Sequence, residues 1–242
     1  ARSMKRLVRS VRPLRRWLVR QTRRPRVGAV DFGDLNRLEP VSRDWGFDRG
    51  TPVDRLYIER FLGAHADDIQ GRVLEVADNT YTKQFGGHRV DRSDVLHPVP
   101  GNPRATLVAD LGTGEGVRDD LFDCIICTQT LQLIYSVETA IDSLSRLLKP
   151  SGVLLLTVPG ISQICREDME ETGDYWRFTT ASLERLLQPA FGDAIEIHTV
   201  GNVYSTTAFI QGLAAEELDV EALDHVDKQF QMLLTARAVK RA

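Results

Sequence analysis

Strand-like and helix-like segments alternate along most of this chain. Seven short segments rich in apolar residues are typical of strands: one ends at residues 89–91, and the others occupy residues 72–77, 105–110, 122–127, 153–158, 194–200 and 231–239. Apolar residues at helical spacing predict helices, most clearly at residues 51–62, 137–148, 180–188 and 205–218. Because such alternation forms βαβ units, the sequence predicts an α/β fold with a mostly parallel sheet and helices on both faces.

These segments divide the 242 residues into three parts. Residues 1–26 form a basic N-terminal arm, and residues 1–3, which precede Met4, resemble an expression-tag remnant. Residues 27–63 form an N-terminal cap of loop and helix, with Thr51 as the expected helix N-cap and Gly63 as its end. Residues 64–242 hold all the predicted strands and form the main domain, which is long enough to bury a sizeable core.

Charge is unevenly distributed along the chain. The arm contains 11 of the 31 Lys and Arg residues and no acid, so the remainder holds all 34 Asp and Glu residues. An acidic main domain argues against nucleic-acid binding, because contacts to phosphate dominate such binding. Apolar residues of the arm recur at helical spacing, interrupted by Pro13, namely Leu7, Val11, Leu14 and Leu18. Two interpretations of residues 4–26 remain open: peripheral contact with an anionic membrane, or a tail that is disordered or packed on an acidic protein surface.

Nothing in the sequence predicts a membrane span, a secretory signal or a metal centre. No apolar run approaches the roughly 20 residues that cross a bilayer, and no uninterrupted apolar segment follows the basic N-terminus. Cys124 and Cys127 fall within a predicted buried strand, and Cys165 alone does not complete a zinc site. The five histidines lack the paired spacing of metal ligands. We therefore interpret the cysteines as packing residues of a cytoplasmic protein.

Three acids occupy positions where nucleoside ligands are commonly bound. In an open α/β sheet, ligands bind beyond the carboxyl ends of the strands. Asp91 is expected to end the second strand, where a carboxylate accepts both ribose hydroxyls, and Asp110 to end the third, beside an adenine edge. Glu75 is expected to order the loop after the first strand. Each acid alone is also typical of a strand end that caps a turn, but the ordered series favours a nucleoside cofactor.

Several segments together resemble the successive motifs of class I S-adenosylmethionine (SAM)-dependent methyltransferases: residues 73–76, 90–91, 108–111, 122–131 and 147–155. The resemblance covers roughly residues 50–240. Its most specific element is an F-D-x-I strand followed, at the family's spacing, by an L-K-P-x-G-x-L turn. Residues 49–55, 81–86 and 173–178 resemble a bacterial subgroup found beside glycosyltransferases in polysaccharide and natural-product pathways. The resemblance implies a Rossmann-like, doubly wound, seven-stranded fold and makes residues 64–242 a SAM-binding domain.

The loop after the first strand departs from the family's E/D-x-G-x-G-x-G pattern. Ala77, Asn79 and Tyr81 replace the three glycines. Asn79 is expected to keep the left-handed turn, and Thr80 to offer its amides to the methionine carboxylate of SAM. Tyr81 adds bulk where the usual loop is bare. Four outcomes are therefore open: SAM binds in an altered pose, binds weakly, binds only with a partner, or does not bind.

The resemblance also implies which residues contact the cofactor: Glu75, Ala77, Asp78, Asn79, Thr80, Tyr81, Asp91, Arg92, Asp110, Leu111, Thr128 and Gln129. Methyl transfer from a sulfonium to a hydroxyl needs a positioned oxygen, a dry site and a proton acceptor.

The acceptor side is expected at residues 173–178. Asp174 is expected to accept a proton, with His97 as a second candidate base, and Arg177 to anchor a polar group of the acceptor. Tyr175 and Trp176 are suited to stacking on a sugar ring. An equally plain alternative is a loop pinned by aromatic packing and an Asp174–Arg177 ion pair. Further acceptor contacts are expected from residues ahead of the sheet and after the fourth strand, namely Arg49, Tyr57 and Gln132.

The leading hypothesis is metal-independent O-methylation of a saccharide or a glycosylated natural product, with a glycosyltransferase as partner. N- or C-methylation is a rival on the same fold. Two further alternatives remain open: an inert module that docks on a membrane or a glycosyltransferase, and a SAM-fold enzyme with a non-methylating reaction. The acids favour cofactor binding, whereas the lost glycines favour the altered or inert alternatives.

Overall fold

The computed structural model describes residues 22 and 25–241. The chain divides between Pro40 and Val41 into two compact units. In the described part of the first unit, a 3₁₀ turn, η1 (Gly33–Leu35), begins where the Gly33 amide donates to Asp31 Oδ1 at 2.8 Å. Most of the basic arm lies outside the described residues. Within them, no helix combines the length and apolarity needed to cross a membrane.

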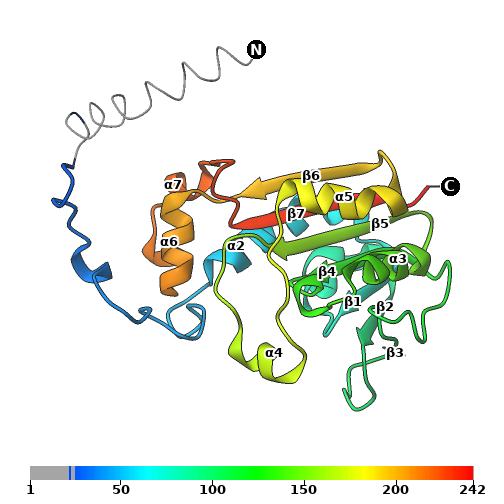
Figure 1. Ribbon diagram of the computed structural model, residues 1–242. Coiled ribbons are helices and arrows are strands. Elements are labelled where there is room, and N and C mark those ends of the chain that lie inside the picture. The colour runs from blue at the N-terminus through cyan, green and yellow to red at the C-terminus, as the bar shows by residue number, and fades with distance from the viewer. Residues whose placement is uncertain (1–21, 23–24, 242) are drawn as a thin grey trace, which may run out of the picture. The chain divides into compact units, whose positions relative to one another are not determined.

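A seven-stranded sheet organises the second unit (Figure 1). Across the sheet the strands are β3 (Leu107–Val108), β2 (Val90–His97), β1 (Gly71–Val76), β4 (Phe122–Thr128), β5 (Leu148–Pro159), β7 (Leu233–Val239) and β6 (Ile195–Val200). Neighbouring strands are parallel from β3 to β5, and β7 runs antiparallel to both β5 and β6. This confirms the expected Rossmann-like, doubly wound, mostly parallel sheet. Strand order reverses between β1 and β4, which is where such sheets bind ligands.

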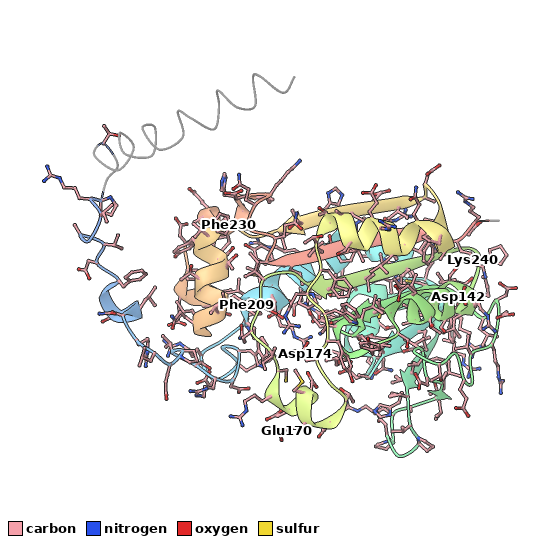
Figure 2. All side chains as sticks on the ribbon, in the orientation of Figure 1. Asp142, Glu170, Asp174, Phe209, Phe230 and Lys240 are labelled. Atoms are coloured by element: carbon pink, nitrogen blue, oxygen red, sulfur yellow. The ribbon has the colours of Figure 1, made fainter. Side chains whose placement is uncertain are left out.

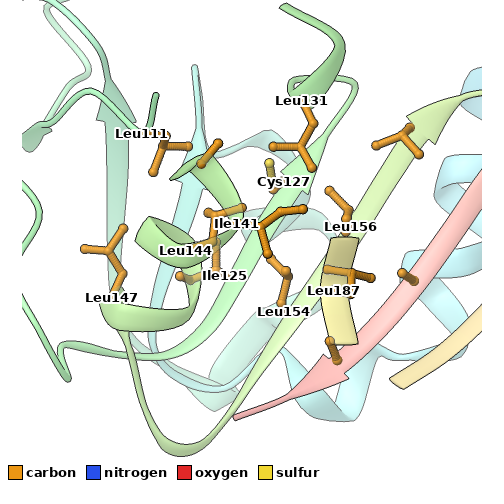
Figure 3. Close-up of a cluster of buried hydrophobic side chains, with 14 of the residues drawn as sticks. Leu111, Ile125, Cys127, Leu131, Ile141, Leu144, Leu147, Leu154, Leu156 and Leu187 are labelled. Carbon is orange, nitrogen blue, oxygen red and sulfur yellow. The ribbon is translucent and has the colours of Figure 1, made fainter. Parts of the chain in front are cut away.

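Two hydrophobic cores cover the two faces of the sheet. Successive strand residues point to opposite faces, so Ile125 and Ile126, both fully buried, belong to different cores. The first core packs under α3 (Val137–Leu147) and α5 (Thr180–Phe191), and Figure 3 shows Leu144, Leu154 and Leu187 among its side chains. The second core packs under α2 (Val53–Ala64), α6 (Val203–Gln211) and α7 (Val220–Asp224). Helices on both faces are therefore confirmed, and α2 belongs to the second unit.

Side-chain caps begin three of these helices, including α7, where Asp219 Oδ1 accepts from the Glu221 amide at 3.0 Å. The Thr179 hydroxyl accepts from the Ser182 amide at α5, and Asn202 Oδ1 accepts from the Tyr204 and Ser205 amides at α6. At α2 the expected Thr51 cap is wrong. The Thr51 amide and hydroxyl instead donate to the Glu216 carboxylate at 2.9 and 2.6 Å, which ties the entry of α2 to η6 (Ala215–Glu217).

Strand β2 begins where the sequence was expected to end it. Residues 91–94 are polar, which hides the strand, but Asp94 is buried because Arg72 and Thr106 each donate to its carboxylate at 2.7 Å. These bonds lower the pKa of Asp94 although its burial alone would raise it. The apolar end of the strand, at residues 95–96, comes only afterwards, so Asp91 lies at the start of β2.

The crossovers on the β1 side are short. A π-helical turn, η3 (Thr82–Gly86), and η4 (Gly87–Arg89) join β1 to β2, and in the described chain loops alone join β2, β3 and β4. Three further short elements complete the chain order. The 3₁₀ turn η2 (Ala66–Asp68) precedes β1, and η5 (Leu131–Leu133) follows β4. The helix α4 (Arg166–Glu171), which the sequence did not predict, lies between β5 and α5. The carboxyl edge of the sheet is therefore bordered mainly by loops.

The two strand cysteines pack in the sheet as expected. Cys124 and Cys127 are both fully buried. Burial raises the pKa of Cys127 to about 12, so its thiol stays protonated.

Candidate active site

A cavity of about 660 Å³, the large cavity, lies at the carboxyl ends of β1, β2, β3 and β4. This is the edge where a doubly wound sheet binds ligands, and the volume is within the roughly 300–1,000 Å³ of small-molecule sites. Its wall contains residues 75–78, 96–98, 109–113, 128–130 and 133–136, together with Arg55, Tyr81, Thr172 and Tyr175.

The loop after β1 keeps a glycine-like turn without glycine. Ala77 has φ of 75°, a left-handed conformation that costs an L-residue roughly 1–2 kcal/mol. Its amide donates to the Leu96 carbonyl at 3.0 Å, which holds the turn against β2. The expectation that Asn79 makes this turn is wrong: its side-chain amide donates to Ser93 Oγ at 3.1 Å, and it does not line the large cavity.

The backbone amides of this loop donate hydrogen bonds to side-chain carboxylates of the chain itself. Buried Glu75 accepts from the Tyr81 amide at 3.1 Å and from the Thr82 amide and hydroxyl at 2.7 Å each. Burial raises the pKa of Glu75, and these bonds offset part of that rise. The Thr80 amide donates to Asp78 Oδ1 at 2.8 Å. The expected use of Thr80 to bind a ligand carboxylate therefore does not fit the structure.

Arg55 on α2 supplies the cavity with a cation that sequence reasoning missed. Its Nη1 donates to the Tyr81 hydroxyl, and its guanidinium carbon lies 5.6 Å from the Tyr81 ring centre. Its Nε and Nη2 have no hydrogen-bond partner among the described residues. Arg49, expected at the site, instead donates from Nε to the Glu217 carboxylate at 2.9 Å and lowers the pKa of Glu217 to about 2. Two signals were available in the sequence: Arg55 follows the predicted start of a helix, and it belongs to residues 49–55, which resemble the bacterial subgroup.

His97 takes the position expected for Asp91. It ends β2 and lines the large cavity, with its Nδ1 2.8 Å from the Val99 carbonyl oxygen. A proton on Nδ1 leaves Nε2 as an acceptor. Asp91 and Arg92 lie exposed at the start of β2, and His97 lies six positions further along the strand, roughly 20 Å from Asp91. The expected cofactor contacts of Asp91 and Arg92 are therefore wrong.

Other expected cofactor residues do line the large cavity: Glu75, Ala77, Asp78, Tyr81, Asp110, Leu111, Thr128 and Gln129. Asp110 Oδ1 accepts from the Gly112 amide at 2.7 Å, and its Oδ2 has no partner among the described residues. Gln129 follows β4 with φ of 48°, a strained conformation of the kind that clusters at functional sites.

A second cavity, of about 250 Å³, shares Arg55 and Gln129 with the first. Its wall comprises Trp45, Phe47, Asp54, Arg55, Gln129, Gln132, Pro159, Ser162, Gln163, Cys165, Asp168, Asp174, Arg177, Phe209, Met232 and Leu233. Figure 2 labels two of these residues, Phe209 on α6 and Asp174 in the loop beyond α4. The expected acceptor residue Gln132 lies in this wall.

Asp174 and Arg177 are engaged with each other and with the backbone. Arg177 donates to both oxygens of Asp174, at 2.5 and 2.8 Å, and to the Gln163 carbonyl at 2.5 Å, while the Cys165 amide donates to Asp174 Oδ2 at 3.0 Å. Burial alone would raise the pKa of Asp174, but these bonds and the Arg177 charge lower it. Asp174 is therefore a poor proton acceptor, and the pair pins the loop between β5 and α5.

The remaining expected acceptor residues are separated. The Tyr175 ring lines the large cavity, 5.4 Å from the ring of Tyr135. Trp176 lines a different groove, between α3 and α5, and its Nε1 donates to the Ile134 carbonyl at 3.1 Å. Tyr57 is buried and donates to the Leu223 carbonyl at 2.7 Å, which ties α2 to α7, so its expected substrate contact does not fit.

A family model described as a methyltransferase domain matches residues 37–223. The chain belongs to this family of methyltransferases. The resemblance to class I SAM-dependent methyltransferases is thereby confirmed, and SAM is the cofactor.

Solved structures share the fold of this methyltransferase. The CurJ carbon methyltransferase is 11% identical with a TM-score of 0.52, over 82% of this chain and 58% of its own. The [4+2]-cyclase SpnF is 16% identical with a TM-score of 0.50, over 80% and 84%. The N-methyltransferase NodS from Bradyrhizobium japonicum WM9, in complex with S-adenosyl-L-homocysteine, is 15% identical with a TM-score of 0.49, over 84% and 95%. A search of curated proteins finds no match. Since a methyltransferase and a cyclase share this fold, the fold alone does not fix the reaction.

The wall of the large cavity fits SAM. Ala77 retains the turn that the family's glycine makes. Asp110 Oδ2 and the His97 ring are available as acceptors for the nucleoside, and the free donors of Arg55 suit a carboxylate. The methionine end would therefore meet a side-chain cation in place of loop amides.

Replacing His97 with alanine should weaken the binding of S-adenosylhomocysteine three- to ten-fold, because a net hydrogen bond contributes roughly 0.5–1.5 kcal/mol. Asp91→Ala should leave the affinity unchanged. Isothermal titration calorimetry of both variants measures this, and an unchanged affinity in the His97 variant would contradict the assignment.

Asp174→Asn should lower the free energy of unfolding at pH 7 by about 1–3 kcal/mol, because it removes a charge-assisted pair. The folded-state pKa of Asp174 is lowered, so its stabilisation is present above the ordinary Asp range and is lost as pH falls through the folded-state pKa. Urea denaturation at neutral and acidic pH should therefore show the difference from wild type shrinking in acid. Asp193→Asn, at an exposed position, serves as the matched control.

Proposed function

We propose that this methyltransferase transfers a methyl group to a hydroxyl oxygen of a small acceptor, a saccharide or a glycosylated natural product, without a metal. The observation that carries the proposal is the pair of adjoining cavities. Arg55 and Gln129 belong to the walls of both, so a ligand in the second cavity would lie directly beside a cofactor in the large one.

On the cofactor side, Asp110 and His97 would hold the nucleoside and Arg55 the methionine carboxylate. Bound SAM supplies an activated methyl group on a sulfonium, whose sulfur is the leaving group. The chain's own contribution is to fix the acceptor oxygen in line with that group and to keep water away.

On the acceptor side, the second cavity supports a small polar ligand with an apolar face. Trp45, Phe47 and Phe209 provide aromatic walls, which suit the C–H face of a sugar ring and exclude water. Gln129, between the cavities, would meet the acceptor and the cofactor at once.

Calorimetry with S-adenosylhomocysteine tests the cofactor side. Wild type should bind, and Arg55→Gln should weaken binding at least ten-fold because charged hydrogen bonds contribute roughly 1.5–3 kcal/mol. Arg104→Gln, at an exposed position, is the matched control and should bind like wild type. Absence of binding by wild type would favour an inert module and sink the proposal.

The basic arm supports a further element of the proposal, peripheral contact with an anionic membrane where a glycosyltransferase partner would supply the acceptor. Residues 4–26 hold most of the arm's positive charge and no acid. Flotation with vesicles containing phosphatidylglycerol should recover the full chain and leave residues 27–242 unbound at low salt. Equal recovery of the two proteins would contradict the membrane contact.

A further inference from the structure

The second cavity contains a carboxylate whose function is unassigned. Asp54 lies in the first turn of α2, directly before Arg55, which stands at the junction of the two cavities. Its side chain lines the second cavity. A group here is close to both the acceptor and the transferred methyl.

Asp54 is poised to accept a proton. Its Oδ1 accepts from the Arg55 amide at 2.9 Å, no other residue among those described donates to its carboxylate, and the side chain lines the second cavity. Burial raises the pKa of Asp54, and the Arg55 charge and amide offset only part of the rise. The carboxylate is therefore more basic than an ordinary aspartate. Asp174, in the wall of the same cavity, is a weaker proton acceptor, because Arg177 donates hydrogen bonds to both of its carboxylate oxygens.

Two glutamine oxygens in the same wall lack donors. Gln132 Oε1 and Gln163 Oε1 are buried without a hydrogen-bond partner, and the Gln132 residue is 8% exposed. A buried acceptor left unpaired costs roughly 1–3 kcal/mol. The cavity wall thus combines three hydrogen-bond acceptors that lack donors: the Asp54 carboxylate and the side-chain oxygens of Gln132 and Gln163. A ligand with several hydroxyl groups would supply the donors.

The size and walls of the cavity narrow the ligand further. Its 250 Å³ is below the roughly 300–1,000 Å³ of sites for drug-sized ligands, which suits a single ring. Trp45, held at φ of 55°, places its ring 5.7 Å from Phe209. A strained residue retained in a cavity wall is typical of a functional site.

We propose that the second cavity binds one uncharged, polyhydroxylated ring of the acceptor, that Gln132 and Gln163 accept two of its hydroxyls, and that Asp54 takes the proton from the hydroxyl that is methylated. This rests on the proposed function and names the residues of its acceptor side.

The step balances without a further reactant. The acceptor oxygen forms a bond to the methyl carbon as the methyl–sulfur bond of the sulfonium breaks, and that electron pair stays on sulfur. The hydroxyl proton passes to Asp54 Oδ2. The products are the methyl ether, the neutral thioether and a protonated Asp54, which releases its proton to water.

The experiment measures transfer of a tritiated methyl group from SAM to the methyl glycosides of glucose, galactose, mannose and rhamnose. Wild type should methylate at least one. Asp54→Asn should lower kcat by 10²- to 10⁴-fold, the usual contribution of a general base, while its affinity for S-adenosylhomocysteine stays within two-fold of wild type. Asp67→Asn, at an exposed position beyond the end of α2, is the matched control.

The pH dependence separates a proton acceptor from a structural group. The charged and titratable groups around Asp54 are Arg55, Tyr81, Cys165, Asp168, Asp174 and Arg177. Activity should rise with pH through an inflection above the ordinary Asp range, and Asp54→Asn should abolish that inflection. Asp54→Glu should restore a pH-dependent rate, so equal loss in both variants would overturn the proposal.

Gln163→Met tests the hydroxyl contacts. It removes an unpaired oxygen at similar volume and should raise KM for the glycoside three- to ten-fold with a smaller change in kcat. Wild-type kcat in Asp54→Asn, or S-adenosylhomocysteine binding without transfer to any of the four glycosides, would overturn this inference while the cofactor assignment stands. Failure to bind S-adenosylhomocysteine would instead overturn the proposed function itself.

Discussion

The buried carboxylate of Glu75 is the interaction on which the site depends. At the end of β1 it accepts three hydrogen bonds from Tyr81 and Thr82, and these close the loop that follows the strand. Closing the loop fixes the Tyr81 ring, and the Tyr81 hydroxyl in turn accepts from Arg55. The position of Arg55 between two cavities therefore follows from a carboxylate that is almost completely buried. The cost of burying that charge is offset only because every one of its bonds is made inside the loop.

This arrangement would change how the chain approaches its cofactor. Where the family's glycines bring bare backbone to the ligand, Ala77 alone keeps the left-handed turn, and the neighbouring amides are already engaged by Glu75 and Asp78. A guanidinium on α2 offers what those amides no longer can. A guanidinium presents several hydrogen-bond donors to a carboxylate, so Arg55 can replace the loop amides as the group that binds the methionine carboxylate. The proposed contact of Arg55 would also couple cofactor binding to α2, the helix that carries Asp54.

Much of the fold was predictable because its signals are local. The strands at residues 72–77 and 122–127 and the helix near residues 137–148 are read from apolar periodicity, which depends on neighbouring residues only. Strand β2 was misplaced because its buried Asp94 looks polar in sequence, and only Arg72 from β1 and Thr106 from beyond the strand make it a core residue. The predicted Thr51 cap was wrong for the same reason, because the Thr51 hydroxyl donates to Glu216, a residue distant in the chain.

The sequence by itself determined most of the strands and helices, the family, the cofactor, and the eight expected residues that line the large cavity, since strand ends of a parallel sheet meet at one edge. Only the tertiary structure decided which side chains are free to act. It paired Arg49 with Glu217, placed Asp91 at the start of β2 rather than at its end, and left Arg55 and Asp54 facing cavities. Whether a charged group is satisfied or available depends on partners that are distant in the chain, and local pattern carries no record of them.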